Sequence, residues 1–227
     1  VEDFVGLDSG QMRDEKAVAA VGDLMMEIRF NNDTGAANEV YFALGKKLEA
    51  DPELLRDKTV GHAWARIWSY LKWMTFPLKT DDEVKGLLER DLVFGIKSNV
   101  EVDRMIEDRL LHLANDIGNL KERQLMSEAM KENEETIGEG DIQLRGRSEA
   151  PKIKNWIADY EQMSKNEGAR TDVDRVAYTN NSENVKKLSA DDRQVLLEVL
   201  ELYDYVRFEA AIPEAYKMQF PLGSTRV

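Results

Sequence analysis

Hydrophobic positions along this chain recur at steps of three and four residues, which is the period of an amphipathic α-helix. The pattern predicts helices over residues 13–30, 34–50, 60–75, 81–90, 99–133, 151–163, 172–179 and 189–208. No segment shows the sustained alternation of apolar and polar residues that is typical of a half-buried strand. The sequence therefore predicts an all-α protein.

The clearest pattern in the first half predicts one long central helix from about Asn99 to Asn133. Its apolar residues alternate steps of four and three, which forms the seam of an antiparallel hairpin or a bundle. The seam consists of Ile106, Leu110, Leu113, Ile117 and Leu120. A bundle built around this helix would occupy residues 1–135.

A segment that breaks the helical pattern follows this bundle. Gly138, Gly140, Gly146 and Pro151 interrupt the apolar periodicity, so residues 136–150 are predicted to be a linker. Residues 151–227 then form a small C-terminal helical module. Its last helix has a clear start, because Ser189 is followed at the third position by Asp192, a variant of the capping box.

Composition narrows the classes of function. The chain has 227 residues, 44 of them acidic and 31 basic, for a net charge of −13. This balance argues against direct binding to nucleic acid, whose affinity comes largely from neutralised phosphates. The absence of cysteine excludes disulfides and thiolate metal sites. The longest hydrophobic region, residues 60–78, contains His62, Arg66 and Lys72, so no membrane insertion is expected. We expect a cytoplasmic protein without a cofactor.

One set of polar residues has the spacing of metal ligands. Asp108, His112 and Asp116 follow one another at steps of four on the predicted long helix. His112 falls nearly opposite the centre of the apolar seam, which favours a solvated polar stripe over a buried metal site. A metal-dependent helical hydrolase that uses Glu107 with these three residues is the alternative. No catalytic residue is otherwise indicated.

Aromatic residues concentrate in the helix predicted over residues 60–75. One stripe is expected to be core, and it consists of Trp64, Ile67, Trp68, Leu71 and Met74. Trp73 lies about 140° from Trp68 around the helix, which removes it from this stripe. An exposed Trp suits a protein-binding surface. Trp73 is therefore a candidate protein-binding residue, together with Tyr205 and Phe208 of the last helix.

Residues 133–208 resemble a family of uncharacterised all-helical proteins from reduced-genome candidate-phyla bacteria (Patescibacteria). The resemblance is carried by short groups of residues: Asn133-Glu134-Glu135, Ile137-Gly138, Ile142, Leu144, Gly146, Pro151, Ile153, Asn155-Trp156, Asp159-Tyr160, Asp174-Arg175, Tyr178, Asn184 to Ser189, Leu196-Leu197, Leu200, Tyr203-Asp204 and Arg207-Phe208. It implies an all-helical cytoplasmic bacterial protein. It supplies no activity, cofactor or site residue, because the function of the family is unknown.

The expected function is that of a non-enzymatic binding or scaffold protein, a subunit or adaptor of a larger cytoplasmic assembly. Amphipathic helices without a catalytic constellation indicate it, and a protein partner is expected. Besides the hydrolase, an acidic regulator that binds the basic surfaces of a nucleic-acid machine fits the same pattern. The sequence does not separate the scaffold from this regulator.

Overall fold

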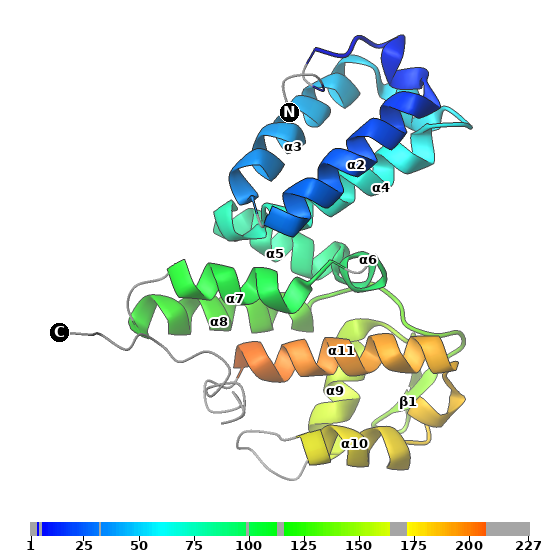
Figure 1. Ribbon diagram of the computed structural model, residues 1–227. Coiled ribbons are helices and arrows are strands. Elements are labelled where there is room, and N and C mark those ends of the chain that lie inside the picture. Colours follow the sequence, from blue (N-terminus) through cyan, green and yellow to red (C-terminus); the bar gives the residue numbers. More distant parts are fainter. Residues whose placement is uncertain are drawn as a thin grey trace, which may run out of the picture. The chain divides into compact units, whose positions relative to one another are not determined.

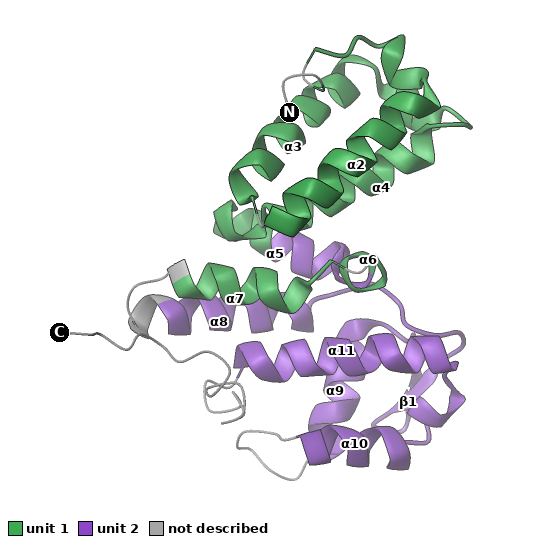
Figure 2. Ribbon diagram, in the orientation of Figure 1, with its two compact units in different colours: residues 1–84, 94–114 green, residues 85–93, 115–227 purple. Residues whose placement is uncertain are grey.

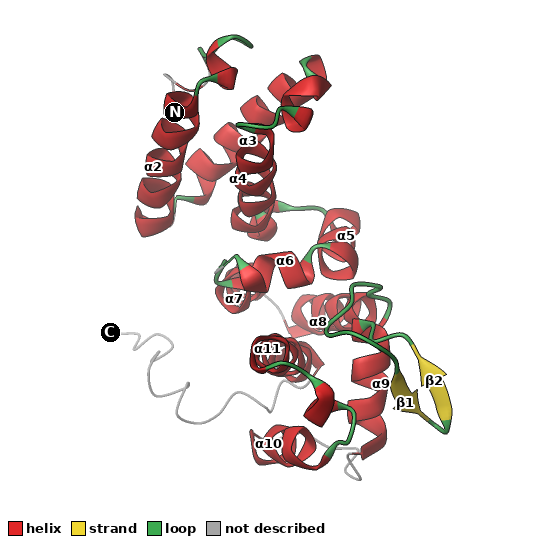
Figure 3. Ribbon diagram, turned by 90° about the vertical axis from the view of Figure 1, so that its right-hand side faces the viewer, coloured by secondary structure: helices red, strands yellow, loops and turns green. Residues whose placement is uncertain are grey.

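The computed structural model describes residues 4, 6–31, 33–98, 100–112, 116–163 and 172–207, with backbone only at residues 112 and 116–118. Within these ranges the chain forms ten α-helices, four short 3-10 helices and one two-stranded sheet (Figures 1 and 3). The prediction of an all-α protein is confirmed. None of the helices in the described ranges has the length and apolar character needed to cross a membrane.

The chain divides into two compact units (Figure 2). Unit 1 comprises residues 1–84 and 94–114, and unit 2 comprises residues 85–93 and 115–227. The division predicted near residue 135 is therefore wrong. The reason is that the helix over residues 116–131 contacts two C-terminal helices and joins their core.

Unit 1 is built on three helices that lie side by side (Figure 1): α2 (Glu15–Asn31), α3 (Thr34–Ala50) and α4 (Gly61–Met74). Apolar residues at helical spacing on each of them form one core that includes the fully buried Trp64. The indole Nε1 of Trp64 donates a hydrogen bond to the carbonyl of Met12, 2.8 Å away. This bond satisfies the only polar atom of a fully buried ring.

Shorter elements complete unit 1. They are η1 (Gln11–Arg13), η2 (Pro52–Arg56), η3 (Phe76–Leu78) and α7 (Val102–His112), with parts of α5 (Asp81–Arg90) and α6 (Leu92–Lys97). At the start of α4 the backbone passes very close to η2. A Cβ atom on Gly61 would lie 2.5 Å from the carbonyl oxygen of Leu55, so only glycine fits there.

Unit 2 packs α8 (Asp116–Lys131) against α9 (Ile153–Met163) and α11 (Ala190–Arg207), with α10 (Asp172–Asn181) contacting α11. The 3-10 helix η4 (Val185–Lys187) leads into α11. The predicted start of α11 at Ser189 is confirmed: the Ser189 hydroxyl accepts from the Asp192 amide at 3.1 Å and donates to the Asp192 carboxylate at 2.8 Å.

The segment predicted as a linker is a β-hairpin within unit 2. Strands β1 (Ile142–Leu144) and β2 (Arg147–Glu149) pair antiparallel, and Arg145 and Gly146 form the turn with φ of 52° and 77°. Two positive φ angles are typical of a type I′ turn, which matches the twist of a hairpin. The amide of Asn184 holds β1 in place, because it exchanges two hydrogen bonds of 2.9 Å with the backbone of Gln143.

The predicted long helix is two helices. α7 ends at His112 and α8 begins at Asp116, and residues 113–115 lie outside the described ranges. Ile106 and Leu110 are buried as the seam requires, but Leu120 is 53% exposed.

A half-buried carboxylate closes the loop between α8 and the hairpin. The Oε2 atom of Glu135 accepts hydrogen bonds from the amides of Leu92 (2.8 Å) and Val93 (3.1 Å) and from the side chain of Asn133 (2.9 Å). Burial raises the pKa of Glu135 above its ordinary value, despite these three donors. Glu135 thus joins α6 to the end of α8. Its ionised form is disfavoured because the carboxylate is partly removed from water.

Glu135→Gln is expected to gain stability relative to the wild type as the pH rises from 4 to 7. A carboxyl group with a raised pKa stabilises the fold below its unfolded pKa, and this contribution is lost as the pH rises through the folded pKa. Urea unfolding across this range measures the difference. Glu134→Gln is the matched control with the opposite sign, because Lys152 and Lys154 lower the pKa of Glu134. A difference for Glu135→Gln that does not change with pH contradicts the prediction.

Candidate protein-binding surface

The helix α2 presents its apolar residues on two opposite sides. Val21, Met25 and Ile28 recur at steps of four and three and are buried in the core of unit 1. This stripe fixes α2 against α3 and α4. The opposite side of the helix therefore faces away from the core.

Large apolar side chains lie on that opposite side. Met26 is 63% exposed and Phe30, one turn later, is 89% exposed. Side chains four residues apart differ by only about 40° in direction around the helix axis, so Met26 and Phe30 share one ridge. The ridge continues backwards through Gly22, where a Cβ would meet no atom within 4 Å, to the exposed Ala19. We name Ala19, Gly22, Met26 and Phe30 the α2 outer face.

The charges around the α2 outer face are uneven. Asp23 and Glu27, also one turn apart, are exposed beside Met26 and Phe30. The basic residue nearest in sequence, Arg29, forms an ion pair of 3.3 Å with Glu101. At the beginning of the helix Glu15 and Lys16 carry opposite charges. The half of the face that holds the large apolar side chains is consequently acidic.

Trp73, predicted as a protein-binding residue, is buried. It is 0% exposed and stacks on Phe76 with ring centroids 5.4 Å apart. Its ring also lies against Gly95, where a Cβ would come within 2.7 Å of the indole. The prediction is wrong because α4 contacts α7 and η3 as well as α3, so a second side of the helix is covered.

The other two predicted binding residues are in the last helix. Tyr205 is half-buried, and the guanidinium of Arg123 lies 5.0 Å from the centre of its ring. Arg123 also donates to the carbonyl of Tyr205 at 2.5 Å, so this part of α11 is bound to α8. Phe208 lies outside the described residues. Met26 and Phe30 are not among the residues predicted from the sequence, although both lie away from the apolar stripe of α2.

The predicted metal ligands do not share one helix. Asp108 and His112 belong to α7 in unit 1, whereas Asp116 begins α8 in unit 2. The premise of a single helical face carrying all three is therefore wrong. The side chains of His112 and Asp116 lie outside the description. Among the residues whose side chains are described, no group of three or more His, Asp or Glu could hold a metal ion.

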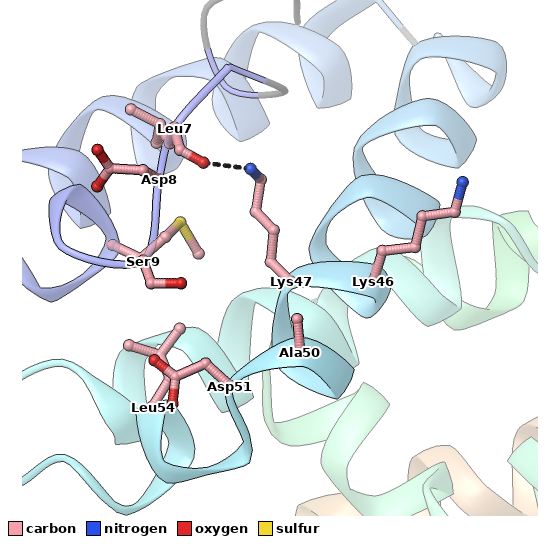
Figure 4. Close-up of a pocket in the computed structure, with 9 residues that line it drawn as sticks. Leu7, Asp8, Ser9, Lys46, Lys47, Ala50, Asp51 and Leu54 are labelled. Carbon is pink, nitrogen blue, oxygen red and sulfur yellow. Dashed lines mark hydrogen bonds between the residues drawn. The ribbon is translucent and has the colours of Figure 1, made fainter.

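Two surface hollows lie on the described parts of the molecule. The first, of about 330 Å³ in unit 1, has Met12 and Leu54 among its lining residues (Figure 4). Lys47, which also lines it, donates to the carbonyl of Leu7, and Asp51 pairs with Arg13 at 2.5 Å. The second, of about 630 Å³ in unit 2, is lined by Lys85, Glu89, Leu125, Glu128, Ala129 and Glu132. In the first hollow, Lys47 and Asp51 therefore already have partners within the protein. In the second hollow, Lys85 and Glu89 form an ion pair of 3.6 Å with each other.

A lysine packed among aromatic rings forms another cluster in unit 1. The Nζ atom of Lys79 lies 4.4 Å from the centre of the Tyr41 ring and 3.5 Å from the carboxylate of Glu83. The Lys79 side chain is 6% exposed, and burial lowers its pKa. Tyr41 in turn stacks on Trp68. The cluster joins η3 and α5 to α3 through a cation–π contact, which is a structural role.

A group of buried polar side chains in unit 2 resembles a catalytic constellation in composition. The Oδ2 atom of Asp159 accepts from the hydroxyl of Tyr178 (2.9 Å), the hydroxyl of Ser182 (3.4 Å) and the amide of Asn184 (3.1 Å). All four residues are buried. Burial and the charge of Asp159 raise the pKa of Tyr178, which keeps its proton on the hydroxyl. The arrangement joins α9 to α10 and the turn before η4.

Two further carboxylates join α11 to its neighbours. Asp204 accepts from the hydroxyl of Tyr160 at 2.8 Å and from the guanidinium of Arg175 at 3.0 Å. Glu161 accepts from Tyr203 and Arg207, both at 2.5 Å. These contacts bind α9 and α10 to α11. Many of the residues that carry the family resemblance are therefore the ones that hold unit 2 together.

The fold and the surface define an all-α protein of two helical units that exposes an apolar helix face. Comparisons with protein-family models, with characterised proteins and with solved structures find no match to this chain. The resemblance to the Patescibacterial family stays a prediction.

Proposed function

We propose that this protein is a non-enzymatic binding or scaffold subunit of a larger cytoplasmic assembly, and that it holds a protein partner on the α2 outer face. The observation that carries the proposal is the exposure of Phe30 and Met26 on one ridge of a helix. Contiguous exposed apolar side chains mark interaction sites in soluble proteins. Phe and Met are also enriched in the cores of protein interfaces.

The packing of α2 against the core of unit 1 favours binding on its outer face. Met26 and Phe30 project from a helix whose inward stripe packs into the hydrophobic core of unit 1. A partner would meet side chains on a fixed backbone, so little conformational entropy is lost from the backbone on binding. The acidic flank also supports the alternative of an acidic regulator, whose partner is a basic surface of a nucleic-acid machine.

Met26→Ser combined with Phe30→Ser is expected to release the partner. Tagged wild type and variant are purified from the protein's own cells, and the co-purifying proteins are quantified by mass spectrometry. We expect a stoichiometric partner with the wild type and at least a tenfold loss with the variant, because truncated interface anchors cost about 2 kcal/mol or more.

The matched control is Val173→Ser combined with Val176→Ser on α10. These valines are 76% and 54% exposed, so the control removes a similar pair of exposed apolar side chains from unit 2. It should retain the partner. A wild-type protein that purifies alone as a compact monomer contradicts the proposed function, and a partner lost only with the control assigns the surface to α10.

A further inference from the structure

The charges beside the α2 outer face indicate what it binds. We infer that the partner presents a basic amphipathic helix, with apolar residues against Met26 and Phe30 and with Lys or Arg beside Asp23 and Glu27. This inference rests on the proposed function and specifies the chemistry of the partner.

The shape of the face suits a helix. Its large side chains lie at the C-terminal end of the face. At the N-terminal end, the small residues Gly22 and Ala19 leave a shallow surface close to the helix backbone. Side chains of an approaching helix pack into such grooves between ridges, and small residues let the two backbones come close. Gly22 has open space where a side chain would project, so a large apolar residue of the partner can occupy it.

The charges favour a basic partner over a second copy of this chain. In a two-fold contact across Met26 and Phe30, Asp23 and Glu27 would lie near their counterparts in the second copy. Four carboxylates would then gather around one axis, and like charges at close range disfavour association. The same carboxylates disfavour nucleic acid and anionic membranes. A row of Lys or Arg on the partner would pair with them.

A synthetic helical peptide of Leu, Ala and Lys, with all Lys on one side, is the probe. Its binding to the full chain is measured by fluorescence anisotropy, beside a scrambled peptide of the same composition and a peptide with Glu in place of Lys. We expect the basic amphipathic peptide to bind at least about tenfold more tightly than either. Its affinity should fall as salt is added.

Two double variants locate the contact. Asp23→Asn with Glu27→Gln should weaken peptide binding about fivefold, since each exposed ion pair contributes less than about 1 kcal/mol. Glu128→Gln with Glu132→Gln removes the same charge from an exposed pair with the same spacing in unit 2, and should leave the affinity unchanged. Met26→Ser with Phe30→Ser should weaken binding at least tenfold.

Four results would overturn the inference. Equal losses with both charge variants would show a general attraction of a basic peptide to an acidic protein. Equal binding of the scrambled or acidic peptide would remove the basic helix as the ligand. Dimerisation that depends on Phe30 would assign the face to a second copy. The fourth result is a cellular partner that needs Met26 and Phe30 but binds through a segment without basic residues. It would contradict this inference alone and leave the proposed function in place.

Discussion

Asp159→Ala is expected to lower the free energy of unfolding of unit 2 by about 3–5 kcal/mol. The substitution removes one acceptor and leaves the donors of Tyr178, Ser182 and Asn184 buried together. Each unsatisfied buried donor costs about 1–3 kcal/mol. We expect no other single polar substitution in unit 2 to have a larger effect.

Hydrogen exchange measures this effect within unit 2. Peptides that cover α9, α10 and α11 should exchange at least about a hundredfold faster in the variant, because each 1.4 kcal/mol is a factor of ten. Peptides from α2 to α4 report on unit 1 and serve as the internal reference.

Two controls test the assignment to the shared acceptor. Tyr178→Phe removes one donor and leaves Asp159 with two others, so a loss of about 1–2 kcal/mol is expected. Ser182→Ala removes two long contacts of 3.4 Å, one to Asp159 and one from the amide of Val185, and should cost less. The order of losses is Asp159→Ala, then Tyr178→Phe, then Ser182→Ala. If the first two are equal, the carboxylate acts through Tyr178 alone.

Gly61→Ala and Gly22→Ala are expected to change stability in opposite directions. At Gly61 the new Cβ would lie 2.5 Å from the carbonyl oxygen of Leu55 and 2.8 Å from that of Leu54. These are backbone atoms, so the contact is relieved only by moving η2 away from α4. A loss of about 2–3 kcal/mol follows.

Gly22 provides the matched control in the same unit. It lies inside α2 with open space where the Cβ would be. Alanine there should raise the free energy of unfolding by about 0.5–1 kcal/mol, because glycine loses more backbone entropy in a helix. Urea unfolding followed by circular dichroism measures both. Gly61→Ala with wild-type stability would contradict the close approach, and a destabilising Gly22→Ala would contradict the open face.

Helical periodicity predicted most of the elements in this protein because local spacing alone decides them. This spacing predicts α2, α3, α4 and α5 and the cap of α11 at Ser189, whereas α6 is not predicted and α7 is predicted only as part of a longer helix. The hairpin over residues 142–149 was missed, since its strands are only three residues long and its stability comes from Asn184, which is distant in sequence. Long-range contacts of this kind leave no periodic signal.

Burial of single side chains was harder to predict than helices. The helical spacing of α4 predicts Trp73 at the surface, because this residue lies off the main apolar stripe. The prediction fails because α4 packs against neighbours on more than one side. Phe30 carries no prediction from the sequence pattern, yet it is the most exposed of the large apolar side chains described. Which face of a helix is covered depends on its neighbours in space.

The division into two units has a consequence for synthesis on the ribosome. Each unit is discontinuous in sequence, because residues 85–93 belong to unit 2 and lie between the two segments of unit 1. Unit 1 lacks α7 until residue 112 has emerged, and residues 85–93 must wait for Asn133 and Glu135 before their hydrogen bonds form. Arg123 meets Tyr205 only after a further 82 residues. Because contacts of such sequence separation form slowly, the nascent chain exposes apolar surface for most of its translation.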